Sequence, residues 1–135
     1  MCSPSLLKGR VQITPEELSR LPLLHQSARP DAWREWFEVA GLSHVNAMGG
    51  ARYELFSMLV QAAKVGLGVT LVPRFFVVNE VATGKLVIPC PQVLRSQRGY
   101  YLVYPENKVG SPSLQVFRRW LLSQAAIYRE TNPTA

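Results

Sequence analysis

The stretch AAKVGLGVTLVPRFF, residues 62–76, decides the fold because it joins a helix to a strand over a few residues. Its small residues suit a helix that packs closely, and Gly66 and Gly68 then favour the end of that helix. The run VTLVP is apolar and largely β-branched, which is typical of a strand covered on both faces. The stretch raises the question whether the strand's end, at Pro73, borders a binding site.

The preceding residues predict two helices and a strand between them. In TPEEL, Thr14 suits a helix N-cap, Pro15 the first helical position, and the two acids the positive end of a short helix. LPLLHQ, residues 21–26, predicts a short buried strand. A helix over residues 31–40, capped by Asp31 and closed by Gly41, should then bury one face. That face consists of Trp33, Trp36, Phe37 and Ala40.

The middle of the chain predicts a strand, a turn and a strong amphipathic helix. SHVNAMGGARY, residues 43–53, alternates loosely and contains a glycine pair, which indicates a strand leading into a turn. The helix should span residues 53–66 with Met58 beside its apolar stripe. That stripe consists of Leu55, Leu59, Ala62 and Ala63.

The last third predicts two more strands and a long helix. We expect a short helix that ends at Gly84, a strand over residues 85–88 and a tyrosine-rich strand in GYYLVYPE, residues 99–106. Ser111 and Pro112 should begin the final helix. Its expected buried stripe consists of Leu114, Phe117, Leu121 and Ala125. Strands that alternate with helices predict an α/β fold with a mostly parallel sheet.

Composition excludes several classes of protein. The chain has 135 residues, 47% of them hydrophobic, so it can build a core. No apolar run is long enough to cross a membrane. The net charge of +6 is scattered and forms no basic arm, which argues against direct binding of nucleic acid. Cys2 and Cys90 fit no metal or redox spacing, so we expect reduced thiols in the cytoplasm.

The sequence also lacks the motifs that are typical of catalytic sites. His25, His44 and Cys90 are solitary, which argues against a metal site, and a lone histidine is most often a hydrogen-bonded structural residue. There is no GxSxG nucleophile elbow, and GGARYE and GLGV are not phosphate loops. We therefore expect no enzyme, no metal and no cofactor.

A binding site built from strand ends remains. In open α/β sheets, ligands bind beyond the carboxyl ends of the strands, near helix N-termini with free N–H groups. Each residue that this rule selects also has a structural interpretation, as a cap, a residue facing the helix interior or a strand stop. The residues selected are Ser27, Arg29, Phe56, Ser57, Pro73 and Arg74.

The order of the motifs resembles the C-terminal effector-binding domain of LysR-type transcriptional regulators. The stretches SPSLL, RPDAW, AAKVGLGVTLVPRF, YYLVYPE and SPSLQVFRRWL carry the resemblance over residues 2–127. The chain looks closest to the branch of the glycine-cleavage and β-lactamase-induction regulators. The resemblance implies part of a type 2 periplasmic-binding-protein fold, with a complete second subdomain and the C-terminal part of the first.

The resemblance also implies a domain organisation and partners. Residues 1–22 would end the first subdomain and cross over, 23–89 would form the second, and 90–135 would return to the first. The family's winged helix-turn-helix has no counterpart before Met1, so the protein would bind DNA only through that missing domain. A homo-oligomer, a small-molecule effector and no membrane are the other expected features.

The family's effector cleft maps onto positions of this chain. It implies contacts from the loop at Ser27, Ala28 and Arg29, and from Phe56 and Ser57 at a helix N-terminus. Pro73 would lie near the hinge. Tyr100 on the returning strand would point toward a small polar, anionic or zwitterionic metabolite, with Leu102 on the same face of that strand.

Three other functions stay open at this point. The chain could serve chiefly as an oligomerisation module without an effector of its own. A solute-binding protein shares the fold, although the chain starts without a signal peptide. An enzyme that depends on His25 or Cys90 is the last alternative.

Overall fold

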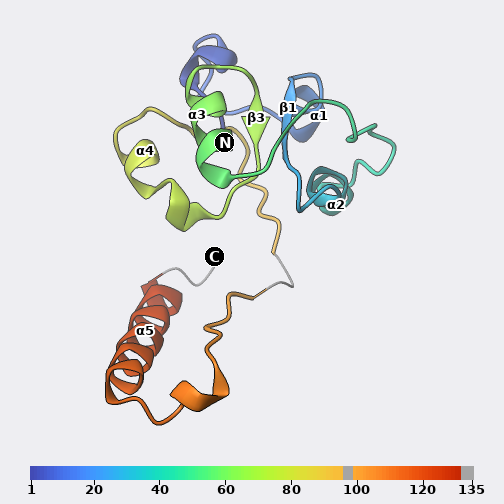
Figure 1. The fold of residues 1–135 in the computed structure, drawn as a ribbon. Coiled ribbons are helices and arrows are strands. Elements are labelled where there is room, and N and C mark those ends of the chain that lie inside the picture. The colour runs from blue at the N-terminus through green and yellow to red at the C-terminus, as the bar shows by residue number, and fades with distance from the viewer. Residues whose placement is uncertain (96–98, 132–135) are drawn as a thin grey trace. The chain divides into compact units, whose positions relative to one another are not determined.

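The computed structural model describes residues 1–95 and 99–131 of the chain. The chain forms two compact units, Met1–Leu94 and Arg95–Ala135, which are described separately (Figure 1). The division expected from the sequence, into residues 1–22, 23–89 and 90–135, stays a prediction.

A three-stranded parallel sheet organises the first unit. Its strands are β1 (Leu23–Gln26), β2 (Ala51–Tyr53) and β3 (Val69–Thr70), in the order β2-β1-β3. The first crossover contains α2 (Ala32–Val39) and connects β1 to β2 at one edge of the sheet. The second contains α3 (Phe56–Lys64) and connects β2 to β3 at the other edge. Because crossovers of one handedness in opposite directions use opposite faces, α2 and α3 should cover different faces of the sheet.

The core on one face is built from the aromatic side chains of α2. Trp33 and Trp36 are 1% and 2% exposed, which confirms the expectation that they anchor the core. The rings of Trp33, Trp36 and Phe37 contact one another, with centroids 5.1 to 5.7 Å apart. The indole N–H of Trp33 donates to the Leu24 carbonyl at 3.0 Å and ties α2 to β1. This cluster also holds Leu23 of the central strand.

The core on the other face is built from α3. Its cluster contains Leu24 of β1 with Leu59, Val60, Ala62 and Ala63 of the helix. Leu24 follows Leu23 directly, so the two clusters use alternate residues of one strand, as a strand covered on both faces requires. The expected stripe is wrong at its start, because the helix begins only at Phe56 and Leu55 is 59% exposed.

The opening stretch folds as a tight passage from α3 into β3. Gly66 has a left-handed φ of 81° and ends the helix, as expected. At Gly68 a side chain would clash, since a Cβ atom there would lie 2.4 Å from the Pro22 carbonyl oxygen. The neighbouring Val69 N–H donates to that same carbonyl at 2.8 Å. The strand itself is shorter than VTLVP, and only Val69 and Thr70 pair with β1.

The N-terminal segment packs beside this sheet. Met1 exchanges hydrogen bonds with Thr70, and Cys2 forms an antiparallel bridge with Val87. The 3-10 helix η1 (Pro4–Leu7) follows, and then α1 (Pro15–Leu18).

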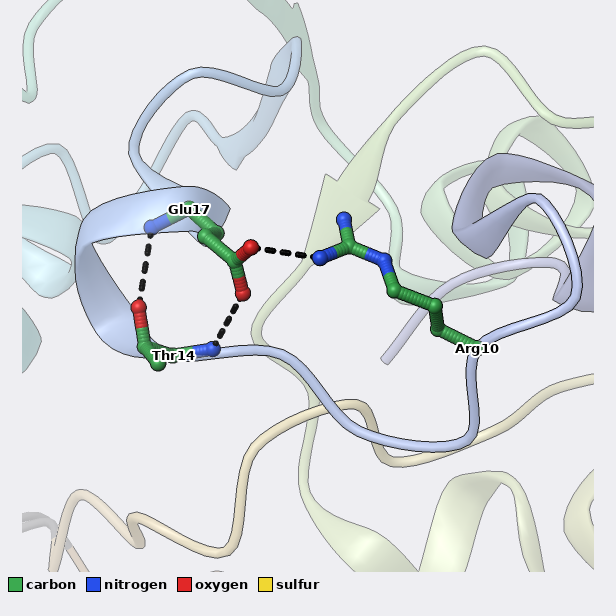
Figure 2. Close-up of polar contacts among 3 residues, drawn as sticks. All are labelled: Arg10, Thr14 and Glu17. Carbon is green, nitrogen blue, oxygen red and sulfur yellow. Dashed lines mark hydrogen bonds and ion pairs between the residues drawn. The ribbon is translucent and has the colours of Figure 1, made fainter.

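A capping box begins α1, as the TPEEL motif predicts. The Thr14 hydroxyl accepts from the Glu17 N–H, and the Glu17 carboxylate accepts from the Thr14 N–H (Figure 2). Arg10 pairs with the same carboxylate. The hydrogen bond from the Thr14 N–H is the largest cause that lowers the pKa of Glu17 below its ordinary value, and the hydrogen bond from Arg10 is the second.

Three other local expectations are corrected here. In residues 43–53 the order is reversed, because turns come first and β2 follows the glycine pair. The strand expected at 85–88 is reduced to the bridge at Val87, after η2 (Arg74–Phe76) and α4 (Val78–Ala82). Asp31 gives α2 no side-chain cap, because its own backbone is already helical and its carboxylate pairs with Arg34 instead.

The second unit consists of η3 (Glu106–Lys108) and α5 (Pro112–Thr131). The long final helix is confirmed, but its expected stripe is wrong, since α5 has no buried residue. The strand expected in GYYLVYPE is also wrong among the described residues, because a strand requires a paired neighbour and residues 99–105 have none. No described helix has the length and hydropathy needed to cross a membrane.

Replacing Gly68 with alanine should destabilise the fold by roughly 2 kcal/mol or more, because overpacking against backbone costs about 1–3 kcal/mol. The added methyl would meet the Pro22 carbonyl and the Leu24 side chain. Gly49→Ala is the matched control, since neither glycine has a left-handed φ and a Cβ at Gly49 meets nothing within 4 Å. Urea unfolding of both variants measures the difference, and equal stabilities would contradict the close approach.

Removing the cap of α1 with Thr14→Ala should cost about 1 kcal/mol, while Thr14→Ser should retain most of the stability. The lowered pKa of Glu17 adds a pH dependence. A carboxyl with a depressed folded pKa stabilises the protein above its ordinary pKa, and loses that contribution as the pH falls. The stability gap between the parent chain and Glu17→Gln should therefore narrow on acidification. A gap that stays constant from neutral pH to the acid range of carboxyls would contradict the role of Glu17.

Candidate functional site

The carboxyl end of β1 is joined directly to that of β2. Gln26 pairs with Tyr53 in the register, and the Ser27 N–H donates to the Tyr53 carbonyl at 2.8 Å. The Gln26 side chain donates to the Glu54 carbonyl at 2.9 Å. Ser27 is exposed at this edge, and the Arg29 N–H turns back to the Gln26 carbonyl at 2.9 Å.

The N-terminus of α3 lies next along the same edge, because this helix follows β2 almost at once. Leu55 is its N-cap and provides no side-chain hydrogen bond, and no acid occupies the first turn. Within the described part of the chain, the N–H groups of Phe56, Ser57 and Met58 have no recorded acceptor. Ser57, the second residue of the helix, is exposed. This arrangement presents free donors and the positive end of a helix dipole.

The end of β3 brings a third segment to this edge. Beyond Thr70 the chain passes Pro73 and enters η2. The rings of Phe56 and Phe76 lie 5.1 Å apart between centroids, and those of Phe75 and Phe76 lie 4.5 Å apart. Ring contact therefore joins the beginning of α3 to the residues that follow Pro73.

The structure thus brings together three of the four predicted segments. The segments at Ser27, at Phe56 and Ser57, and at Pro73 all follow the carboxyl ends of parallel strands in one sheet. Tyr100 belongs to the second unit, where its side chain is 73% exposed. The two units are not placed relative to one another, so the participation of Tyr100 stays a prediction.

Two residues of this edge were not expected from the sequence. The Gln26 side chain of β1 donates to the Glu54 carbonyl, and the ring of Phe76 contacts that of Phe56. A polar residue that closes a buried run, as in LLHQ, is the signal that marks Gln26. Nothing in the sequence pairs Phe76 with Phe56, because their contact depends on how α3 and β3 pack.

The histidine of β1 and the two cysteines of the chain are buried in the first unit. His25 is buried, and its Nε2 lies 2.8 Å from the Gly49 carbonyl, to which it can only donate. That contact confirms the structural interpretation of this histidine. Both cysteines are buried, and burial raises the pKa of the Cys2 thiol. Among residues 1–95 and 99–131, no group of three His, Cys, Asp or Glu side chains is placed to hold a metal ion.

Residues 1–126 match the family model described as the LysR substrate binding domain. The Glycine cleavage system transcriptional activator of Escherichia coli (strain K12) is 36% identical over 131 residues, which cover 96% of this chain and 43% of that protein. The HTH-type transcriptional regulator PerR of the same strain is 34% identical over 128 residues, which cover 92% of this chain and 41% of that protein. The chain therefore spans less than half the length of these relatives.

A solved structure shows the same fold. The effector domain of the transcriptional regulator AmpR of Pseudomonas aeruginosa superposes with a TM-score of 0.77 at 23% identity, over 97% of this chain and 62% of that chain. This likeness confirms the predicted α/β fold of the periplasmic-binding-protein type.

The family model carries the assignment of this chain to a family. Both relatives described above are named as regulators of transcription. The match to the family model covers nearly the whole chain, including the three segments at the carboxyl edge of the sheet. The chain belongs to the LysR substrate-binding-domain family.

Proposed function

We propose that this chain is the effector-binding part of a LysR-type transcription regulator and that its effector binds at the carboxyl edge of the β2-β1-β3 sheet. The observation that carries the proposal is the convergence of three loop segments on the uncapped N-terminus of α3. Free N–H groups and a helix dipole favour a ligand with negative charge. The Ser57 hydroxyl adds a donor at the same place, and Arg29 and Arg74 follow two of the strands.

The chemistry of this edge favours a small polar metabolite, anionic or zwitterionic, as the effector. As the family resemblance implies, Tyr100 would be a further contact of this ligand. The ligand would favour one arrangement of the subdomains, and its different affinity for the two arrangements would shift a homo-oligomer and the DNA bound to it. DNA contact itself would belong to a winged helix-turn-helix domain elsewhere in the full-length protein. Such a regulator would act in the cytoplasm.

The relatives support this proposal at the level of the family. One relative is named as an activator of the glycine cleavage system, so amino acids that include glycine form a suitable first panel of compounds. Thermal-shift screening of the full-length protein against that panel, together with other small anions, would identify an effector.

Substitution of Ser57 by alanine in the full-length protein should weaken effector binding roughly tenfold or more, because hydrogen bonds to charged groups contribute about 1.5–3 kcal/mol. Tyr100→Phe should have a similar effect. Calorimetric titration with the identified effector measures both, and a promoter reporter measures the response.

Ser113→Ala and Tyr101→Phe are the matched controls. Ser113 is exposed and occupies the second position of α5, as Ser57 does in α3, and Tyr101 is exposed beside Tyr100. Both controls should bind and respond as the parent does. Unchanged affinity in Ser57→Ala and Tyr100→Phe would show that the site is elsewhere, and a regulator whose activity depends on no small molecule would support the oligomerisation module instead.

A further inference from the structure

A surface depression of about 510 Å³ lies at the C-terminal end of α3. None of the residues predicted for the effector site lines it. Since α3 connects two parallel strands, it begins at the carboxyl edge of the sheet and runs back to the amino edge. Its nine residues span about 13 Å at 1.5 Å per residue, so the depression and the candidate effector site are at opposite ends of one helix.

The depression is lined by cations and hydrogen-bond donors from three segments of the chain. Lys64 and Gln61 come from α3, Lys85 from the segment after α4, and Ser5 from η1. No Asp or Glu lines it. Within the described part of the chain, the side chains of Lys64, Lys85 and Gln61 have no recorded hydrogen bond or ion pair. Two positive charges therefore share this depression without a carboxylate to balance them.

The end of α3 does not need the ammonium group of Lys64. Lysine at a helix C-terminus often interacts with the last free carbonyls. Here the Ala63 carbonyl accepts from Gly66 at 3.1 Å and from Ser3 at 3.2 Å, and the Ala62 carbonyl accepts from Leu67 at 3.0 Å. Backbone donors have thus satisfied these carbonyls, and Lys64 is left to interact with a ligand.

We propose that this depression binds a phosphate group carried by a small organic molecule. Lysine ammonium groups bind phosphate as compact point charges. A phosphate group carries a charge of about −1.5 to −2 near neutral pH, so it matches the two lysines of the depression better than a single carboxylate would. Its volume falls within the range of about 300–1,000 Å³ that is usual for small-molecule sites, so it exceeds the needs of a bare ion. Val65 and Pro4 add apolar surface for the organic part.

The Ser5 hydroxyl completes the set of groups. It lies 2.9 Å from the hydroxyl of Ser3, which is 8% exposed and accepts from the Ser5 N–H at 3.4 Å. In such a pair one hydroxyl donates to the other, and the second hydrogen remains for a phosphate oxygen. The pair is fixed in place because the Ser3 N–H is held by the Ala63 carbonyl.

Calorimetric titration of the 135-residue chain with sodium phosphate, at an ionic strength kept constant with sodium chloride, tests the proposal. Phosphate should bind saturably with one site per chain. Lys64→Gln and Lys85→Gln should each weaken binding roughly tenfold, the usual effect of losing a hydrogen bond to a charged group. Lys108→Gln, which removes a lysine of η3 outside the depression, is the matched control and should bind phosphate as the parent does.

Three results would overturn the proposal. The first is a heat of phosphate binding that does not saturate, and the second is a phosphate affinity that falls as much in Lys108→Gln as in the other two variants. The third is succinate binding as tight as phosphate binding, because the depression would then have no preference for a phosphate group. Lys64→Gln and Lys85→Gln change no residue predicted for the effector site, and Ser57 lies at the other end of α3. Failure of this site is therefore measured separately from failure of the effector site.

Discussion

The close approach of Gly68 to the Pro22 carbonyl is the constraint on which the first unit depends. Val69 can donate to that carbonyl only because the preceding residue has no Cβ atom. This contact sets where β3 meets β1, and so how far α3 extends before the chain must turn. The helix then covers one face of β1 while the aromatic residues of α2 cover the other. A displacement of β3 would therefore disturb both cores.

The same constraint assembles the carboxyl edge. With β3 fixed beside β1, the residues after Thr70 must leave the sheet where β1 and β2 also end. Pro73 then directs the chain into η2, and Phe76 meets Phe56 at the first position of α3. The question raised by the opening stretch has a geometric answer, since the strand is part of the core and its far end belongs to the edge where the candidate site lies.

Sequence patterns predicted the elements whose causes are local. The cap at Thr14, the aromatic face of α2 and the helix end at Gly66 each depend on neighbours within one or two turns. Patterns were misleading where a distant partner decides the outcome. Residues 99–105 have strand-like composition but no paired neighbour, and the apolar residues of α5 are not buried. The same holds for the candidate site. The ends of its strands could be predicted from the sequence, whereas the contact of Phe56 with Phe76 depends on how α3 and β3 pack.

The two proposed sites share α3, and this sharing limits how each can influence the other. Leu59 and Ala63 are fully buried on the helix, so it is expected to move as one body or not at all. A ligand at either end changes the position of α3 only by as much as its affinity differs between two positions. Any coupling would also be reciprocal, so that a phosphate ligand which strengthens effector binding must itself be bound more tightly when the effector is present. A helix held rigidly by its core would instead make the two sites independent.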